Sequence, residues 1–160
     1  MSKIKEVLND KESVLVFDVD GVLAKMAWGE YNHYGEDDDT WAKMYENEAN
    51  YYTEEYVCKR MQNFLQDKDK SRIYVITKAF NDNEANDKRN FVNKFYGIPK
   101  NHVYYVKNNL DKVHVLCDIK KEYKTLPDYK LVMIEDTVEV LTNIMENTKF
   151  STVHISSFLD

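Results

Sequence analysis

Short apolar runs alternate with amphipathic stretches along most of this chain. The runs are rich in valine, isoleucine and leucine, and they occupy residues 14–17, 73–76, 103–106, 131–134 and 153–155. Short runs without polar alternation are typical of strands that are buried on both faces, as in a parallel sheet. We therefore expect five such strands.

Helical periodicity fills the spaces between these runs. Residues 84–96 carry an apolar stripe that stops at Gly97, a residue that commonly ends a helix. The same spacing recurs over residues 111–123 and 138–146. Alternation of strand and helix predicts an α/β fold, a three-layer doubly wound parallel sheet with helices on both faces.

One long segment interrupts the alternation. Residues 22–71 separate the first two strands, whereas a βα loop usually has about 2–6 residues. Aromatic and acidic side chains dominate residues 22–56, which we expect to form a small helical cap. Residues 51–64 are expected to return to the sheet as a helix. The whole chain, 1–160, then forms a single domain whose core comprises residues 1–21 and 57–160.

Polar residues follow three of the predicted strands. These residues are Asp18 and Asp20 after the first run, Thr77 and Lys78 after the second, and Glu135 and Asp136 after the fourth. Open parallel sheets bind ligands beyond the carboxyl ends of their strands. The functional site is therefore expected at this edge.

The segment VLVFDVDGVLA, residues 14–24, carries the most specific pattern. An apolar strand runs into two acids one residue apart, and a glycine follows where the chain must turn sharply. A simple turn or a calcium loop would also fit Asp-x-Asp-Gly. A calcium loop is disfavoured because Val22, Leu23 and Ala24 are apolar where an EF-hand loop supplies further oxygen ligands.

This segment resembles the first motif of the haloacid dehalogenase superfamily, a hydrophobic strand that runs into Asp-x-Asp-Gly-hydrophobic. The resemblance extends over about the whole chain through three further motifs. It implies a phosphatase in which Asp18 is the nucleophile and Asp20 is the general acid and base. Thr77 corresponds to the second motif and would hold phosphoryl oxygens.

The remaining two motifs supply charge. The third is a lysine near the start of the helix before the fourth strand, for which Lys112 is the leading candidate and Lys107 and Lys120 are competitors. The fourth is an acidic pair, Glu135 and Asp136, which could otherwise cap a helix. The resemblance implies a Mg²⁺ cofactor held by Asp18, the backbone carbonyl of Asp20, and Asp136, with Glu135 as a direct or indirect ligand.

The substrate expected from this resemblance is a small phosphorylated metabolite. Residues 76–106 are also similar to deoxyribonucleotidase-like members, which favours a nucleoside monophosphate. Lys78 and the rings of Trp28, Tyr31 and Trp41 are then expected to bind it, with stacking on the base. Alternatively, these rings form the core of the cap.

Two other functions stay open from the sequence. A 3′-phosphatase acting on nucleic-acid ends is one, although its known relatives carry an arginine shortly after the second-motif serine, where Lys78 and Ala79 follow Thr77 here. A non-catalytic binding module is the other, although both Asp18 and Asp20 are present.

Composition narrows the choice of partners and compartment. The formal net charge is -6 and the lysines are dispersed, so extended nucleic acid is a poor partner. No apolar run approaches the roughly 20 residues of a membrane-spanning helix. Two cysteines without metal-type spacing and an N-terminus without an apolar signal region predict a cytoplasmic protein.

Overall fold

The computed structural model describes residues 3–26, 39 and 51–159. Five strands form one parallel sheet: β1 (Val14–Phe17), β2 (Ile73–Lys78), β3 (Val103–Val106), β4 (Leu131–Glu135) and β5 (Ser151–His154). Their order across the sheet is β3-β2-β1-β4-β5. This order fits a Rossmann-like arrangement, and it confirms the predicted α/β fold.

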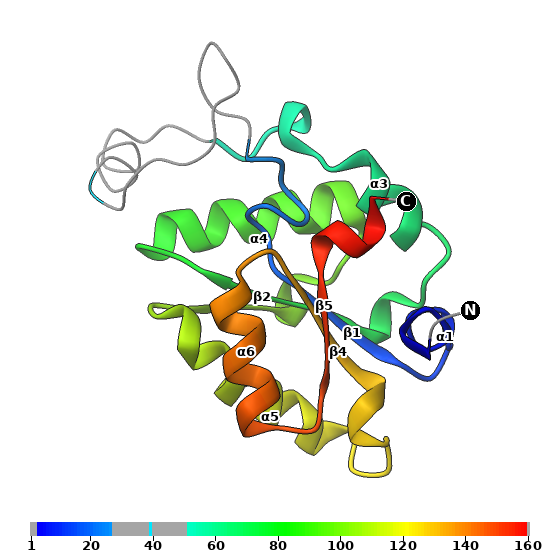
Figure 1. The fold of residues 1–160 in the computed structure, drawn as a ribbon. Helices are drawn as coiled ribbons and strands as arrows, with labels where there is room; N and C mark the ends of the chain where they lie inside the picture. Colours follow the sequence, from blue (N-terminus) through cyan, green and yellow to red (C-terminus); the bar gives the residue numbers. More distant parts are fainter. Residues whose placement is uncertain (1–2, 27–38, 40–50, 160) are drawn as a thin grey trace.

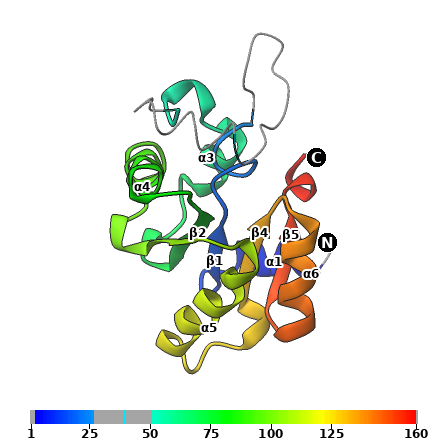
Figure 2. The ribbon, with the colours of Figure 1, turned by 90° about the vertical axis from the view of Figure 1, so that its left-hand side faces the viewer.

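Helices cover both faces of the sheet (Figures 1 and 2). The described helices are α1 (Lys3–Asn9), α3 (Lys59–Leu65), α4 (Asp82–Tyr96), α5 (Lys112–Glu122) and α6 (Val138–Asn147). One face packs against α1, α3 and α4, and the other packs against α5 and α6. The three predicted layers are therefore present.

Strand β1 shows how the sequence builds two cores. Its four residues are buried, and successive side chains point to opposite faces of the sheet. Leu15 and Phe17 enter the core beneath α3 and α4, whereas Val14 and Val16 enter the core beneath α5 and α6. A central strand that is buried on both faces has no room for the polar alternation of a half-exposed strand.

Helix α4 begins and ends where the local sequence dictates. Asn81 is the N-cap, and its side chain accepts a hydrogen bond from the backbone N–H of Glu84. Gly97 adopts the left-handed conformation, with φ of 68°, at the C-terminus. The observed helix starts two residues before the predicted one because the cap lies at Asn81.

The helix expected over residues 51–64 is only partly present. A short 3-10 helix, Glu54–Tyr56, precedes α3, and Val57 between them is extended. Val57 forms an isolated antiparallel bridge with Ala24, and this pairing prevents a continuous helix. Two other predictions need adjustment, because β5 begins and ends earlier than the fifth apolar run and α1 was not anticipated.

The residues nearest to β1 in the expected cap belong to the main core. Val22, Leu23 and Ala24 are almost fully buried and pack in the same cluster as Phe17. Trp28, Tyr31 and Trp41 lie outside the described residues. Within the described parts of the chain, none of the helices has the length and apolar character required to cross a bilayer.

Candidate functional site

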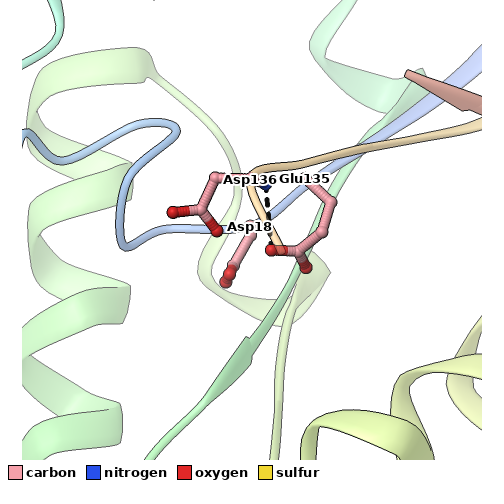
Figure 3. Close-up of side chains that lie close together, drawn as sticks. All are labelled: Asp18, Glu135 and Asp136. Atoms are coloured by element: carbon pink, nitrogen blue, oxygen red, sulfur yellow. Dashed lines mark hydrogen bonds between the residues drawn. The ribbon is translucent and has the colours of Figure 1, made fainter. Parts of the chain in front are cut away.

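The acids of the first and fourth motifs meet because β1 and β4 are neighbours. Phe17 pairs with Ile134 in the sheet, and the Asp18 N–H donates a hydrogen bond to the Ile134 carbonyl at 3.0 Å. Asp18 follows β1, while Glu135 ends β4 and Asp136 follows it. Carboxylate oxygens from these three acids lie within 4.8 Å of one another (Figure 3).

Lys112 supplies the positive charge at this cluster. Its side chain is 1% exposed, and its Nζ lies 2.9 Å from Asp18 Oδ2 and 2.7 Å from Glu135 Oε2. The competing lysines are engaged elsewhere: Lys107 donates to the Phe80 carbonyl, and Lys120 pairs with Asp128 at 3.4 Å. Among the three candidates, Lys112 is the one that contacts the acids.

Two buried carboxylates share this one ammonium group, and their pKa values diverge. Burial favours the neutral form of Asp18, but the charge and hydrogen bond of Lys112 hold the Asp18 pKa below its ordinary value. Burial and the Asp18 charge raise the pKa of Glu135 to about 9, against the opposing effect of Lys112. Burial alone would lower the pKa of Lys112, yet the two acids raise it. Of these two acids, Asp18 is therefore the more readily ionised.

Glu135 is fixed by donors on both of its oxygens. Its Oε1 accepts from the N–H groups of Asp136 and Thr137, at 3.1 and 3.2 Å, while Oε2 faces Lys112. Asp18 Oδ1 accepts one backbone N–H, that of Val19, at 2.7 Å. Because three donors already engage the oxygens of Glu135, this residue is poorly placed to bind an ion directly.

The donor set fits a hard divalent cation. Three carboxylates supply only oxygen ligands, which Mg²⁺ prefers, and no sulfur or nitrogen donor joins this cluster in the described residues. Gly21 makes room for the arrangement, because a Cβ at this residue would lie 2.0 Å from Asp136 Oδ2. Asp18 and Asp136 could hold such an ion, and the predicted ligation by the backbone carbonyl of Asp20 stays a prediction.

Asp20 has a separate set of partners. Its Oδ1 accepts a hydrogen bond from the Tyr52 hydroxyl, and its Oδ2 lies 2.7 Å from Lys88 Nζ. Burial raises the pKa of Asp20, and although Lys88 opposes this, the charge on nearby Asp18 adds to it. The first-motif acids therefore lie in different environments, one paired with Lys112 and the other with Lys88.

Sequence reasoning missed Lys88 and Tyr52. Lys88 was visible as a lysine on the buried stripe of α4, three residues after Ala85 and four before Val92. A charged residue at such a position needs a buried partner. Tyr52 gave no comparable signal, because it lies 32 residues from Asp20 along the chain.

Thr77 and Lys78 end β2, the other neighbour of β1. Thr77 is fully buried, and its hydroxyl donates to the Lys78 carbonyl at 3.4 Å, so its predicted contact with phosphoryl oxygens stays a prediction. Lys78 borders an open cavity of about 400 Å³, which Lys107 and Thr137 also line. Thr137 is the neighbour of Asp136 in the sequence, but Asp18, Glu135 and Asp136 themselves do not line this cavity. The expected contacts of Trp28, Tyr31 and Trp41 fall outside the described residues.

Neither a protein-family model nor a curated protein matches this sequence. A solved structure described as that of DsGPDH of Dunaliella salina is similar, with a TM-score of 0.58 and 12% sequence identity. The similarity covers 94% of this chain and 24% of that one, so this chain spans about a quarter of the other's length. At this identity the likeness shows the α/β fold alone.

Proposed function

We propose that this chain is a magnesium-dependent phosphatase of the haloacid dehalogenase superfamily, which hydrolyses a small phosphomonoester through an aspartyl-phosphate on Asp18. The observation that carries the proposal is the contact of Asp18 with buried Lys112, beside Glu135 and Asp136. These residues come from opposite halves of the chain. A cluster of buried acids that shares one lysine is costly without a function, because desolvated charges seldom stabilise a fold.

Asp18 would act as the nucleophile. Its lowered pKa keeps the carboxylate ionised, and one of its oxygens attacks phosphorus while the bond from phosphorus to the ester oxygen breaks. Lys112, which touches Asp18, offsets the negative charge that gathers there. A magnesium ion bound by Asp18 and Asp136 would supply further positive charge against the phosphoryl oxygens.

Asp20 would move the protons. It gives a proton to the departing ester oxygen in the first step. In the second step it takes a proton from water, whose oxygen attacks phosphorus as the bond to Asp18 breaks, and inorganic phosphate leaves. The two environments described above support this division of roles, because Asp18 is held ionised while burial raises the pKa of Asp20.

The preferred substrate class is a nucleoside or deoxynucleoside monophosphate. The cavity lined by Thr137 has a volume of about 400 Å³, within the usual range for small-molecule sites, and two lysines and Glu139 also line it. The net positive charge of these three side chains favours a substrate with negative charge. A cytoplasmic setting is part of the proposal, and two free cysteines, Cys58 and Cys117, are consistent with a reducing compartment.

The test uses the full chain and several esters. p-Nitrophenyl phosphate, a panel of nucleoside monophosphates and a 3′-phosphorylated oligonucleotide are assayed with Mg²⁺ and with chelator. We expect turnover that needs Mg²⁺ and disappears in Asp18→Asn, together with a hydroxylamine-sensitive phosphoenzyme in the wild type. Asp118→Asn, at an exposed residue paired with Lys121, is the matched control and should retain full activity.

Three outcomes would contradict parts of the proposal. Turnover that survives in Asp18→Asn would show that Asp18 is not the nucleophile. A preference for the 3′-phosphorylated oligonucleotide would replace the substrate class. Absence of turnover on every ester, with the protein folded and Mg²⁺ present, would favour a binding module.

A further inference from the structure

A buried lysine in α4 touches the proposed proton-transfer residue. Lys88 is 1% exposed, and its Nζ lies 2.7 Å from both Asp20 Oδ2 and Glu84 Oε1. It also donates a hydrogen bond to the backbone carbonyl of Lys78, at the end of β2. All three ammonium protons therefore have acceptors, and the side chain links α4 to the ends of β1 and β2.

Glu84 holds Lys88 in position. The Phe80 N–H donates to Glu84 Oε2 at 2.6 Å, so the glutamate is folded back over the start of α4. Its Oε1 remains directed at Lys88, one turn along the same helix face. With two carboxylates and one carbonyl around its Nζ, the Lys88 ammonium group is held in one place.

The opposite oxygen of Asp20 is held by Tyr52. The Tyr52 hydroxyl donates to Oδ1 at 2.7 Å, and its ring packs on Phe91 of α4 with centroids 5.7 Å apart. Asp20 therefore has a donor on each oxygen, yet its side chain is still 25% exposed. Each carboxyl oxygen has a second lone pair, so one can carry a proton on the exposed edge while both donors stay in place.

Stability alone gives little reason for this network. Well-packed apolar residues of similar volume often serve a core as well as a buried ion pair does. Here the ion pairs link Glu84 to Lys88 and Lys88 to Asp20, which lies on the same edge of the sheet as Asp18. The contact with Asp20 therefore indicates a role in the site and not only in the core.

We propose that Lys88, backed by Glu84 and assisted by Tyr52, is a positioning residue that holds the Asp20 carboxyl group in one orientation for proton transfer to the leaving group. This inference rests on the phosphatase function proposed above. It assigns no contact between Lys88 and substrate. Its effect is instead on geometry, since a misplacement of about 1 Å can cost about 100-fold in rate.

Dependence on the leaving group separates positioning from general damage. An alkyl phosphate leaves as a basic alkoxide and needs the proton from Asp20, whereas a dinitrophenyl phosphate leaves without one. The comparison uses kcat/KM, which reports the steps up to departure of the leaving group. Loss of positioning should therefore lower kcat/KM for the alkyl ester and spare the dinitrophenyl ester.

The main variant is Glu84→Gln/Lys88→Met, which removes both charges and so leaves no stranded glutamate. We expect kcat/KM to fall about 10- to 100-fold for the alkyl ester and less than about 3-fold for the dinitrophenyl ester. Tyr52→Phe, which keeps the ring, should show the same selectivity and provides a second test if the double variant fails to fold. Adding Glu84→Gln/Lys88→Met to Asp20→Asn should cause no further loss.

Equal losses of kcat/KM on both esters, or a further loss of kcat/KM when the double substitution is added to Asp20→Asn, would contradict the role of Lys88 without contradicting the proposed phosphatase. Other results would contradict the phosphatase itself. Wild-type protein without Mg²⁺-dependent turnover, or an active Asp18→Asn, would remove the proposed function, and the assignment of Lys88 would fall with it.

Discussion

The carboxylate of Asp136 lies directly over the α-carbon of Gly21. A Cβ at Gly21 would stand 2.0 Å from Asp136 Oδ2 and 2.7 Å from its Cγ, closer than any real contact. Gly21 also has φ of 74°, a conformation that L-residues rarely adopt. The turn after β1 is thus shaped to admit an acid from the turn after β4.

Gly21→Ala should therefore disturb the proposed metal site as well as the backbone. The positive φ costs about 1–2 kcal/mol for a residue with a Cβ. In addition, Asp136 must move away from Gly21 and so leave its position in the acid cluster, and we expect Mg²⁺ affinity and phosphatase activity to fall at least about tenfold. Calorimetric titration with Mg²⁺ and steady-state kinetics would measure both.

Gly97→Ala is the matched control for this substitution. Gly97 has a similar φ of 68°, but a Cβ there meets only Lys70 Cε at 3.8 Å, an ordinary contact. It should lose comparable stability and keep its Mg²⁺ affinity and activity. Equal Mg²⁺ affinity in the two variants would contradict the importance of the approach between Gly21 and Asp136.

Lys112→Met should leave the ionised carboxylate of Asp18 buried without its cation. Breaking a buried ion pair from one side typically lowers the free energy of unfolding by about 3–5 kcal/mol. Mg²⁺ should restore part of this loss, because an ion between the acids replaces the missing charge. Urea denaturation with and without Mg²⁺ would measure the loss and its recovery.

Lys120→Met provides the comparison for that experiment. Lys120 pairs with partly exposed Asp128, and such pairs contribute about 0–1 kcal/mol. A small loss that does not respond to Mg²⁺ is expected. If Mg²⁺ restored no stability to Lys112→Met, the acids near Lys112 would not be the site of the ion.

Mg²⁺ binding should release a proton below about pH 9. The pKa of Glu135 is raised to about 9, so this acid is mainly neutral at pH 7 before the ion binds. A divalent charge among the three acids lowers that pKa, whether or not Glu135 is a ligand, and the proton leaves. Affinity should therefore rise with pH and level off above about 9.

Calorimetry in two buffers of different ionisation enthalpy would count the released protons. We expect release at pH 7 and much less at pH 9.5. Glu135→Gln, which has no proton to lose, should show little release at either pH. Binding at pH 7 without proton release in the wild type would contradict this protonation state.

Tyr96→Phe should affect stability and leave catalysis unchanged. The buried Tyr96 hydroxyl donates to the Leu23 carbonyl and accepts from the Cys58 N–H at 3.1 Å. Since the Cys58 N–H also bonds to the Leu23 carbonyl at 3.0 Å, each group keeps a partner in the variant. We expect a loss of about 1 kcal/mol by urea denaturation, with unchanged kcat/KM.

Tyr129→Phe is the control, because Tyr129 is 53% exposed and its substitution should change little. A loss in Tyr96→Phe no larger than in this control would show that the hydroxyl of Tyr96 is unimportant. A large fall in activity would show that Tyr96 acts beyond the core.

The three central strands, β1, β2 and β4, could be predicted because they are buried almost throughout. Their apolar runs therefore stand out, and β1 coincides with the run at residues 14–17. Strand β5 lies at the edge of the sheet and mixes polar with apolar residues, so its position was predicted two residues late at its start. The helix α1 buries mainly Leu8, which is too little to produce a clear periodic signal.

Prediction of the site followed the same physical logic. Asp18, Glu135 and Asp136 each follow or end a strand, and parallel strands bring such residues to one edge. Lys112 was harder to distinguish from Lys107 and Lys120, because the burial of a lysine side chain depends on how α5 packs against the sheet. The partners of Asp20 depend on tertiary contacts across 32 and 68 residues, which no local pattern encodes.

The bridge between Ala24 and Val57 closes the connection from β1 to α3 at its base. Hydrogen bonds join Lys25 to Tyr56 and Cys58 to Leu23 on either side of it. Because the chain is already paired at this junction, the pairing of the strands does not depend on the length of the segment inserted beyond it. Doubling the length of a loop costs only about 0.6 kcal/mol in closure entropy. A foreign sequence grafted between residues 26 and 51, which keeps Tyr52 and its hydrogen bond to Asp20, should leave the register of all five strands intact.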